Sequence, residues 1–356
     1  MHLGVVGLNH KTAPIEVREK VAVPEGTLGT GLRALLCLPV FQEGVLLSTC
    51  NRTEIYFVSD QPTGALFPQV SSFLKGSASF PEDEFRGYCY EYENERAVNH
   101  LFRVACGLDS MILGEAQIMG QVRTAFQLSQ SVKGTRAILN TLFNRALHTG
   151  GRTRSETRIG ERPVSVSHAA VQLAKNIFGK DLNRHPVLIV GAGKMSRFSV
   201  ELLKRFGAES IFVANRSYER AGELTELVKG EAVPFDRLSD VLSQVDVVIS
   251  STSAAQPIIS YETVRCVMPL RKERPLFFID IAVPRDVEPR VGTLDNVFLY
   301  DIDDLKAVVS DNIKYREQEV PRVELIISEE AKKFWKWYLA RQALQFASEE
   351  TLVSLA

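Results

Sequence analysis

A glycine-rich turn placed directly after an apolar run constrains the fold of this chain more than any other feature. Residues 186–196 read P-V-L-I-V-G-A-G-K-M-S, so Gly191, Gly193 and Ser196 stand at the three small-residue positions of a dinucleotide-binding fingerprint. Gly191 permits a tight turn, Gly193 lets the backbone approach a pyrophosphate, and the following helix offers free N–H groups at the positive end of its dipole. The residues expected to contact a dinucleotide here are Gly191, Ala192, Gly193, Lys194, Met195 and Ser196.

Apolar runs and helical patterns alternate around this turn. Strands are expected at 187–190, 211–214, 245–250 and 277–280, and amphipathic helices at 195–206 and 218–229. Continuous apolar strands that alternate with helices are typical of a parallel sheet covered on both faces. The sequence therefore predicts a doubly wound, Rossmann-like domain over residues 156–300.

The end of the second predicted strand bears on the choice of cofactor. An NAD site usually carries Asp or Glu about 20 residues after the glycine turn, where the carboxylate binds the ribose hydroxyls. This chain has Asn215, Arg216 and Ser217 there, and a guanidinium beside a hydroxyl suits a 2′-phosphate. The interpretation is NADPH rather than NADH; the alternative is that Arg216 is an ordinary solvent-exposed arginine. The hydroxyl residues 250–252, after a later strand, either contact the cofactor or form a plain polar loop.

The first part of the chain predicts a different fold. Strands are expected at 3–9, 45–49, 54–58 and 88–92, and helices at 14–21, 27–37, 65–75 and 94–106. The order strand, helix, strand, strand, helix, strand is that of a ferredoxin-like α+β domain, in which helices cover one face of an antiparallel sheet. With longer helical patterns at 116–131 and 136–149, the sequence predicts a first domain over residues 1–155.

Cys50 is the candidate nucleophile of this first domain. It lies in the polar turn S-T-C-N-R-T-E between two predicted strands, whereas Cys37, Cys89 and Cys106 fall on apolar faces typical of structural cysteines. The thiolate is the reactive form of cysteine, and a nearby cation such as Arg52 favours it. The residues alone leave a structural role for Cys50 open. A nucleophile and a nicotinamide site in one chain suggest thioester reduction, with the substrate undetermined.

The composition excludes several classes of protein. A net charge of −1 argues against a protein that holds RNA only by neutralising its phosphates. The five cysteines are odd in number and contain no C-x-x-C pair, so neither a metal site nor a disulfide framework is expected, and a reducing cytosol is indicated. The amino terminus lacks the pattern of a signal peptide, and no apolar stretch approaches the about 20 residues of a membrane span. We expect a cytoplasmic protein without membrane contact.

Seven segments of the chain together resemble one family, the glutamyl-tRNA reductases of porphyrin biosynthesis. They are G-L-N-H-K-T-A-P at 7–14, S-T-C-N-R-T-E at 48–54, G-L-D-S-M-I-L-G-E-A-Q-I at 107–118, R-S-E-T-R-I-G at 154–160, S-V-S-H-A-A at 165–170, V-G-A-G-K-M at 190–195 and I-D-I-A-V-P-R-D at 279–286. The resemblance covers roughly residues 1–330, and the segments at 48–54 and 107–118 are highly specific together.

The resemblance implies an activity and a set of site residues. In this family the cysteine that matches Cys50 attacks the activated ester of glutamyl-tRNA, the tRNA leaves, and hydride from NADPH gives glutamate-1-semialdehyde for tetrapyrrole biosynthesis by the C5 pathway. A histidine important for activity matches His100, which would otherwise be described as a partly buried structural histidine. The residues that look like the substrate pocket are Thr49, Asn51, Arg52, Ser110, Glu115, Ala116, Gln117 and Gln121.

The chemistry of these side chains agrees with a glutamyl substrate. Arg52 can clamp the side-chain carboxylate with two hydrogen bonds, and Glu115 can pair with the α-ammonium. Gln117 and Gln121 are four residues apart, so one face of a helix presents both amides. His100 would act as an acid or base near the thioester.

The family also predicts how the chain is organised and what it meets. It implies an N-terminal catalytic domain, an NADPH domain and a long helix that ends in a dimerisation domain. Residues 301–356 are predicted as one long charged helical segment, shorter than the dimerisation region usual in the family. The expected partners are glutamyl-tRNA, a second copy in a homodimer, and the aminomutase that takes glutamate-1-semialdehyde. Arg152, Arg154 and Arg158 are expected either to meet tRNA phosphates or to belong to a solvated helix face or a set of interdomain ion pairs.

Two other functions compete with this one. The first is a shikimate-dehydrogenase-like NADP oxidoreductase, whose nucleotide domain also combines a G-x-G turn with an N-R-S strand end. The second is a non-catalytic regulator that binds tRNA or the cofactor. Neither has a use for Cys50.

Overall fold

The computed structural model describes residues 1–76, 78–160, 165–305 and 316–354. It divides into two compact units, one made of Met1–Arg162 with Ile313–Ala356 and the other of Pro163–Asn312. The C-terminal helix therefore packs within the first unit, and the chain enters the second unit once and returns. The sequence predicted functional domains that end at residues 155 and 300. The division into compact units does not test where one function ends and another begins, so these boundaries stay a prediction.

The first unit is built on a four-stranded antiparallel sheet with the order β2-β3-β1-β4. Its strands are β1 (His2–Asn9), β2 (Glu43–Ser48), β3 (Arg52–Ser59) and β4 (Tyr90–Glu93). This is the strand order of the ferredoxin-like fold, so the predicted fold of the first unit is confirmed. Strands β2 and β3 are joined by the short turn that carries Cys50, and Ser48 pairs with Thr53.

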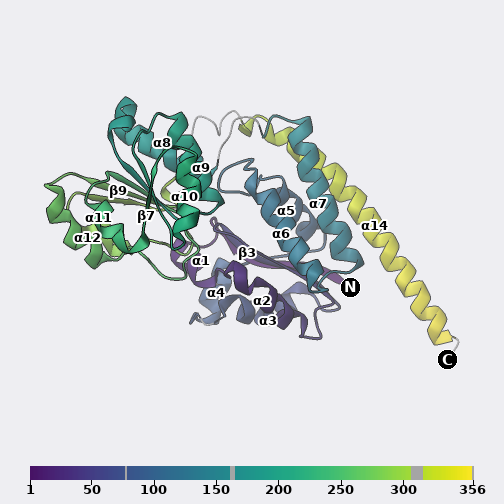
Figure 1. The fold of residues 1–356 in the computed structure, drawn as a ribbon. Coiled ribbons are helices and arrows are strands. Elements are labelled where there is room, and N and C mark those ends of the chain that lie inside the picture. Colours follow the sequence, from purple (N-terminus) through teal and green to yellow (C-terminus); the bar gives the residue numbers. More distant parts are fainter. Residues whose placement is uncertain (77, 161–164, 306–315, 355–356) are drawn as a thin grey trace. The chain divides into compact units, whose positions relative to one another are not determined.

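Helices cover one face of this sheet as predicted (Figure 1). They are α1 (Ile15–Val21), α2 (Leu28–Leu36), α3 (Thr63–Lys75) and α4 (Glu82–Tyr88), with a short 3-10 helix η1 (Glu25–Thr27) between the first two. Val6, Leu8, Ile55 and Phe57 point from the strands into the core beneath them. Helix α4 was not predicted, and its last residue had been assigned to a strand. Its first turn holds three acidic residues, which favour a helix N-terminus.

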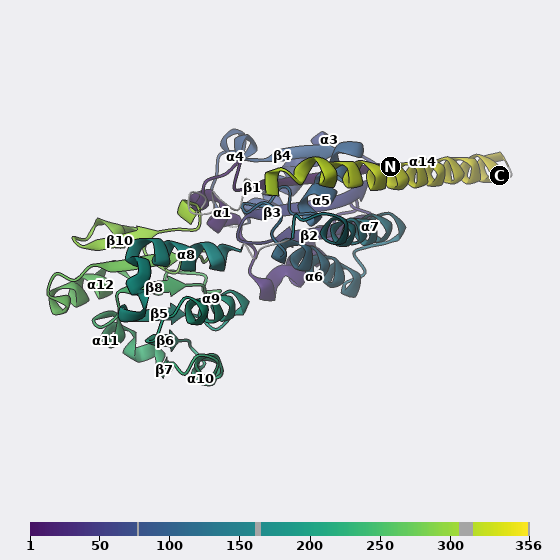
Figure 2. The same cartoon turned by 90° about the horizontal axis from the view of Figure 1, so that it is seen from above.

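The second face of the sheet is covered as well, which the sequence analysis did not predict. Helices α5 (Glu95–Ala105), α6 (Gln117–Ser131), α7 (Ala137–Glu156) and α14 (Val320–Ser354) lie there. The reason is the alternation in the strands, because Leu3, Val5, Tyr56 and Val58 point to this face and are buried with the helices. The expectation of helices on one face only was therefore wrong. Two views show α14 running beside the other helices of this unit (Figures 1 and 2).

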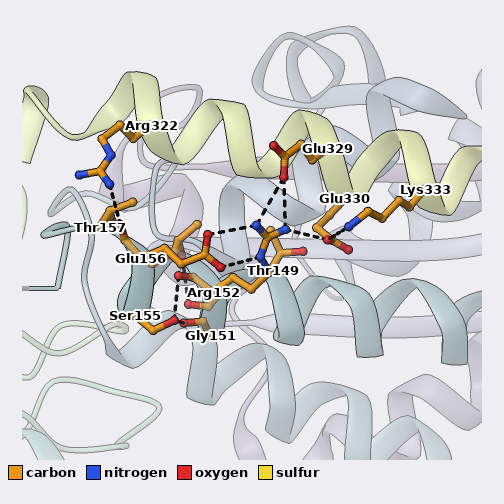
Figure 3. A network of polar contacts seen from close by, with 12 residues as sticks. Thr149, Gly151, Arg152, Ser155, Glu156, Thr157, Arg322, Glu329, Glu330 and Lys333 are labelled. Carbon is orange, nitrogen blue, oxygen red and sulfur yellow. Dashed lines mark hydrogen bonds and ion pairs between the residues drawn. The ribbon is translucent and has the colours of Figure 1, made fainter.

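Ion pairs join α14 to α7 (Figure 3). The Arg152 guanidinium lies 2.8 Å from Oε1 of Glu156, 2.8 Å from Oε1 of Glu330 and 3.4 Å from Oε2 of Glu329. Lys333 also donates to Glu330, at 2.7 Å. Arg152 thus forms ion pairs within the first unit and not between domains, and its predicted contact with tRNA phosphates stays a prediction.

The second unit contains a six-stranded parallel sheet with the order β10-β9-β8-β5-β6-β7. Its strands are β5 (Val187–Val190), β6 (Ile211–Ala214), β7 (Glu231–Val233), β8 (Val247–Ser250), β9 (Leu276–Asp280) and β10 (Val297–Tyr300). The strand order reverses between β5 and β8, the topological switch point at which doubly wound sheets bind their ligands. The predicted Rossmann-like fold is confirmed.

Helices precede and connect these strands. They are α8 (Val166–Phe178), α9 (Lys194–Arg205), α10 (Tyr218–Glu226), α11 (Leu238–Leu242) and α12 (Tyr261–Val267), with 3-10 helices η2 (Gly179–Arg184), η3 (Phe235–Arg237), η4 (Met268–Arg271) and η5 (Pro289–Thr293). The tail was predicted as one helix from residue 301, which is wrong for residues 301–305, because they form a turn and a short 3-10 stretch. Helix α14 begins at Val320, and residues 306–315 and 355–356 lie outside the described residues. No helix in the described part of the chain is both long and apolar enough to cross a lipid bilayer.

Candidate active site

Cys50 lies at the tip of the turn between β2 and β3. The backbone N–H of Thr49 donates to the carbonyl of Arg52 at 2.8 Å, and Thr49 Oγ1 accepts from the backbone N–H groups of Asn51 and Arg52, both at 3.2 Å. The cysteine itself is half-buried. Thr49, predicted as a pocket residue, thus holds the turn that presents the sulfur.

A buried arginine holds this turn through hydrogen bonds. The Arg18 side chain is 3% exposed, and its Nη1 donates to the carbonyl of Cys50 at 2.8 Å and to Oδ1 of Asn51 at 3.4 Å. Its Nε donates to the carbonyl of Ala13 at 3.2 Å. The sequence analysis missed Arg18, although its position shows a signal. It shares the buried face of α1 with Ile15 and Val21, where a charged residue needs a specific partner.

The surroundings of Cys50 favour the neutral thiol. Burial raises the pKa of Cys50 to about 12, the negative charge of Glu115 acts in the same direction, and the cations of Arg18 and Arg52 oppose both. Arg52 does lower the pKa of Cys50, as predicted, but it contributes less than Arg18. Together the two arginines do not outweigh burial and the charge of Glu115. The predicted effect of Arg52 therefore has the right direction, but in the protein without substrate burial outweighs it. An ammonium group bound at Glu115 would remove one of the two raising effects.

Glu115→Gln is expected to speed alkylation of Cys50. Since the pKa lies above the assay range, the thiolate fraction and the rate should rise about tenfold per pH unit from about pH 7 to pH 9. Removing the Glu115 charge lowers the pKa, so the variant should react several-fold faster at each pH. The measurement is iodoacetamide labelling read at the Cys50 peptide by mass spectrometry. The exposed Glu95→Gln is the matched control, and an unchanged rate in Glu115→Gln would contradict the prediction.

A buried carboxylate organises the sheet face behind the turn. Glu54 is 0% exposed and accepts hydrogen bonds from Arg52 Nη1 at 2.6 Å, His100 Nε2 at 2.9 Å and the hydroxyl of Tyr56 at 2.6 Å. The hydroxyl of Tyr90 donates to it as well. Burial alone would raise the pKa of Glu54, but Arg52, His100 and the hydroxyl donors hold it well below its usual range. Glu54 is therefore a permanent anion at physiological pH.

The geometry gives Arg52 a different role from the one predicted. Its side chain is 1% exposed, Nη1 is bonded to Glu54, Nη2 donates to the carbonyl of Asp109, and Oδ2 of Asp109 lies 3.7 Å from Nη1. Both terminal nitrogens thus already have protein partners. The expected carboxylate clamp is not supported by this arrangement. Arg52 instead ties the cysteine hairpin to the segment that contains Asp109.

His100 belongs to the same buried cluster. Its Nε2 contacts Glu54, its Nδ1 lies 3.8 Å from Oδ2 of Asp109, and its ring packs against those of Tyr56, Tyr90 and Tyr92 with centroids 5.1–6.4 Å apart. None of the contacts described for His100 is with Cys50. An acid or base role for His100 stays a prediction, and the geometry supports a positioning role.

The loop after α5 carries most of the remaining predicted pocket residues. Gly107 (φ +75°) and Gly114 (φ +73°) shape it, and the N–H of Gly114 donates to the carbonyl of Gly107 at 2.9 Å. A side chain at Gly114 would lie 2.6 Å from the carbonyl oxygen of Ile159. Arg154 Nη2 donates to the carbonyl of Glu115 at 2.8 Å, so this arginine braces the loop.

Four pocket candidates on this loop and helix have side chains suited to a polar substrate. Glu115 is 6% exposed, and the Oγ of Ser110 is a buried hydroxyl without a hydrogen-bond partner among the described residues. Such a hydroxyl is costly to leave unpaired, which favours a partner supplied by a ligand. Gln117 and Gln121 are half-exposed on the first turn and a half of α6, and Ala116 is exposed where the helix begins.

The glycine turn of the second unit fits a dinucleotide. Gly191 has φ +108°, and a Cβ there would lie 2.8 Å from the carbonyl oxygen of Ser251. Gly193 is exposed at the N-terminus of α9 and a Cβ on it would meet nothing within 4 Å, so a pyrophosphate can approach the backbone. Ser196 is buried and its Oγ lies 2.7 Å from the Oγ of Ser251. Ala192 lies between the two glycines, Lys194 is exposed where α9 begins, and the half-buried Met195 precedes Ser196, the first buried residue of the helix.

The three residues after β6 differ in whether their side chains are bonded within the protein or are exposed to solvent. Ser217 caps α10 by accepting from the N–H of Arg220 at 3.4 Å, and Asn215 Nδ2 donates to the carbonyl of Ser217 at 3.0 Å. The Arg216 side chain is exposed. Of the three residues predicted to select NADPH, Arg216 is the one whose side chain can reach a ligand, while the other two shape the loop that presents it.

The fold and these sites define a class of protein: an oxidoreductase with a dinucleotide-binding unit and a separate unit that presents a cysteine. A family model of the N-terminal domain of glutamyl-tRNA reductase matches residues 6–157, and one of shikimate/quinate 5-dehydrogenases matches residues 172–308. The chain belongs to the glutamyl-tRNA reductase family.

Individual relatives support this membership over nearly the whole chain. Glutamyl-tRNA reductase of Paenibacillus macerans is 48% identical over 337 residues, which are 95% of this chain and 77% of the relative. That of Bacillus subtilis (strain 168) is 45% identical over 338 residues, 95% of this chain and 74% of the relative. The solved glutamyl-tRNA reductase from Methanopyrus kandleri superposes with a TM-score of 0.52 at 36% identity, covering 99% of this chain and 82% of that one.

Proposed function

We propose that this protein reduces glutamyl-tRNA to glutamate-1-semialdehyde with NADPH, through a thioester on Cys50, as the first step of tetrapyrrole synthesis by the C5 pathway. The observation that carries the proposal is the half-buried Cys50, held at the tip of a hairpin by Arg18 and within the electrostatic reach of Glu115. The membership in the family and the dinucleotide turn at Gly191 supply the substrate class and the second reactant.

The reaction proceeds in two chemical steps. The Cys50 sulfur, once deprotonated, bonds to the ester carbonyl carbon, and the bond to the ribose oxygen of the tRNA breaks; that oxygen takes up a proton. When NADPH is bound, its nicotinamide supplies a hydride to the thioester carbonyl. The carbon–sulfur bond then breaks and returns the thiolate, and the product is the aldehyde.

Glu115 is the proposed partner of the substrate α-ammonium. Its carboxylate is buried and lies close enough to Cys50 to raise the pKa of the thiol. Binding an ammonium there neutralises that charge, so the substrate itself promotes the thiolate. Ser110 would donate its unpartnered hydroxyl to the substrate, and the amides of Gln117 and Gln121 would bind at the same end of α6.

The other predicted pocket residues act on the sulfur indirectly in this proposal. Thr49, Asn51 and Arg52 fix the hairpin, and Ala116 leaves room where α6 begins. His100 holds Glu54 and through it Arg52. We propose these as positioning residues of the Cys50 turn.

NADPH is the proposed reductant because of Arg216. Arg216→Ala is expected to weaken NADPH binding about tenfold or more while it changes NADH binding less than about twofold, since only NADPH carries the 2′-phosphate. Fluorescence titration of both nucleotides measures this. Arg220→Ala removes an exposed arginine from the next turn of the chain and is the matched control. Equal weakening of the two nucleotides by Arg216→Ala would assign Arg216 to the surface instead.

The proposal includes the surroundings in which the protein works. We propose a cytoplasmic homodimer that passes its reactive aldehyde to an aminomutase. The exposed Leu325, Leu339 and Leu344 on α14 support a second copy. All five cysteines are free, which suits a reducing compartment.

Turnover of the purified full chain tests the proposal. Glutamyl-tRNA and NADPH should give tRNA, NADP⁺ and an aldehyde that a hydrazine reagent traps. A shikimate-dehydrogenase-like enzyme would instead oxidise shikimate with NADP⁺, and a regulator would bind tRNA without releasing glutamate from it. Absence of the trapped aldehyde with intact glutamyl-tRNA rejects the proposed function.

A further inference from the structure

Two buried carboxylates lie at the carboxyl ends of the second unit's strands, and the proposed mechanism uses neither. Asp280 ends β9 and is 1% exposed, and Asp286 in the loop that follows is 0% exposed. Burying a carboxylate costs free energy unless specific donors satisfy it. The hydrogen-bond donors of these two carboxylates therefore identify the segments that Asp280 and Asp286 hold in place.

Asp286 holds the loop that follows β8. Its Oδ2 accepts from the backbone N–H of Thr252 at 2.7 Å, and the hydroxyl of Thr252 donates to its Oδ1. The same hydroxyl accepts from the N–H of Ala254 at 3.1 Å. One carboxylate thus fixes both the backbone and the side chain of Thr252, and through Thr252 the next turn of the loop.

The other side of this loop is fixed to the glycine turn. The N–H of Ser251 donates to the carbonyl of Val190 at 2.9 Å, and its hydroxyl lies 2.7 Å from that of Ser196. Its carbonyl oxygen is the atom that excludes a side chain at Gly191. The loop after β8 is therefore held between the pyrophosphate turn and Asp286, so its position depends on both.

Asp280 joins the loop after β9 to the same cluster. It accepts from the hydroxyl of Ser250 at 3.0 Å and from the N–H groups of Ala282 at 3.0 Å and Val287 at 2.9 Å. Burial and the negative charge of Asp286 raise the pKa of Asp280 to about 7. Two neighbouring buried carboxyl groups are an energetically unfavourable arrangement. Both of them accept hydrogen bonds from the loops that follow β8 and β9 or from the end of β8.

The location of these loops indicates which part of a dinucleotide they meet. A doubly wound sheet binds one mononucleotide over each half, across the point where the strand order reverses. The half made by β5, β6 and β7 carries the glycine turn and Arg216, which suit the pyrophosphate and the adenosine 2′-phosphate. The half made by β8, β9 and β10 is left for the nicotinamide nucleotide.

We propose that Asp286 and Thr252 are positioning residues that fix the loop after β8 for the nicotinamide half of NADPH. This inference rests on the proposed function for the identity of the nucleotide. Of the two alternatives for residues 250–252, it favours a loop over side-chain contacts with the cofactor. Each of the three hydroxyls is bonded inside the protein, to Asp280, Ser196 and Asp286 respectively.

Two ligands titrated against the full chain test the proposal. NADPH probes both halves of the site, and 2′,5′-ADP probes the adenosine half alone. Thr252→Val keeps the shape of threonine and removes its hydroxyl, and Asp286→Asn removes the charge. Both variants should weaken NADPH about tenfold, and in Thr252→Val the affinity for 2′,5′-ADP should change less than about twofold. Asp286→Asn also removes a charge near Arg216, so it is compared for NADPH alone. Simple loss of folding would weaken the two ligands together, so the ratio of their affinities separates positioning from stability.

Controls make the result decisive. Thr252→Ser keeps the hydroxyl and should recover most of the NADPH affinity lost in Thr252→Val. Glu288→Gln alters a nearby carboxylate that accepts from the N–H of Tyr261 at 2.8 Å, outside the loop, and should behave as the wild type. Unchanged NADPH affinity in folded Thr252→Val, or a parallel loss of both ligands, overturns the proposal. The titrations need no tRNA, so a wild-type protein that binds NADPH but fails to reduce glutamyl-tRNA rejects only the proposed function.

Discussion

Cys50→Ser is expected to abolish formation of the aldehyde, with a loss of at least about a thousandfold in turnover, while NADPH binding stays within about twofold of the wild type. A serine hydroxyl is far less acidic than a thiol, and the described contacts at this turn offer no general base to deprotonate it. The ester exchange that it could perform would also give a poor acceptor of hydride. The nucleotide site lies in the other compact unit of the chain, so the substitution leaves its residues in place.

The covalent step is measured without NADPH. Wild-type protein mixed with radiolabelled glutamyl-tRNA should retain acid-stable label and release tRNA, whereas Cys50→Ser should do neither. Cys37→Ser is the matched control, because Cys37 is an exposed cysteine of the same unit. Label retained by Cys50→Ser, or lost from Cys37→Ser, would move the nucleophile away from Cys50.

Local patterns allowed much of the fold to be predicted. Strands β5 (187–190) and β6 (211–214) begin and end where the apolar runs predict, because buried parallel strands are continuous apolar segments bounded by turn residues. The dinucleotide turn was equally predictable, since the spacing of Gly191 and Gly193 between an apolar strand and a helix is visible in one short segment of the sequence. Strand β7, with three residues, and helix α12, with seven, were missed because neither shows a clear hydrophobic period.

The environment of Cys50 could not be predicted in the same way. Arg52 looks like a free cation in the sequence, yet its partners include Asp109, 57 residues along the chain, and Glu54, which also binds His100. Whether a charged side chain is available to substrate depends on such distant partners. One signal was present in the sequence, since Glu54 points to the same face of β3 as Tyr56 and Val58, which are buried in the core. A carboxylate on an inward-facing strand position predicts a buried network, although it does not identify the members.

Glu54→Gln is therefore expected to destabilise the first unit by about 3–5 kcal/mol, the usual cost of leaving one partner of a buried ion pair uncompensated. The guanidinium of Arg52 stays 1% exposed, and the amide that replaces the carboxylate cannot accept from all of the donors that surround it. The second change, Arg52→Met in the Glu54→Gln background, removes the stranded charge. The double variant should be less destabilised than the sum of the two single variants, since the two residues are coupled.

Urea denaturation followed by tryptophan fluorescence measures the free energy of unfolding of the first unit. Both tryptophans of the chain, Trp335 and Trp337, lie on α14 and pack against the core of the first unit. Glu82→Gln is the control. It breaks the ion pair with Lys75, in which the glutamate is 48% exposed, and such a surface pair is worth about 1 kcal/mol or less. If Glu54→Gln cost no more than this control, the carboxylate would not be the centre of the network behind Cys50, and the rigidity assigned to that turn would need another source.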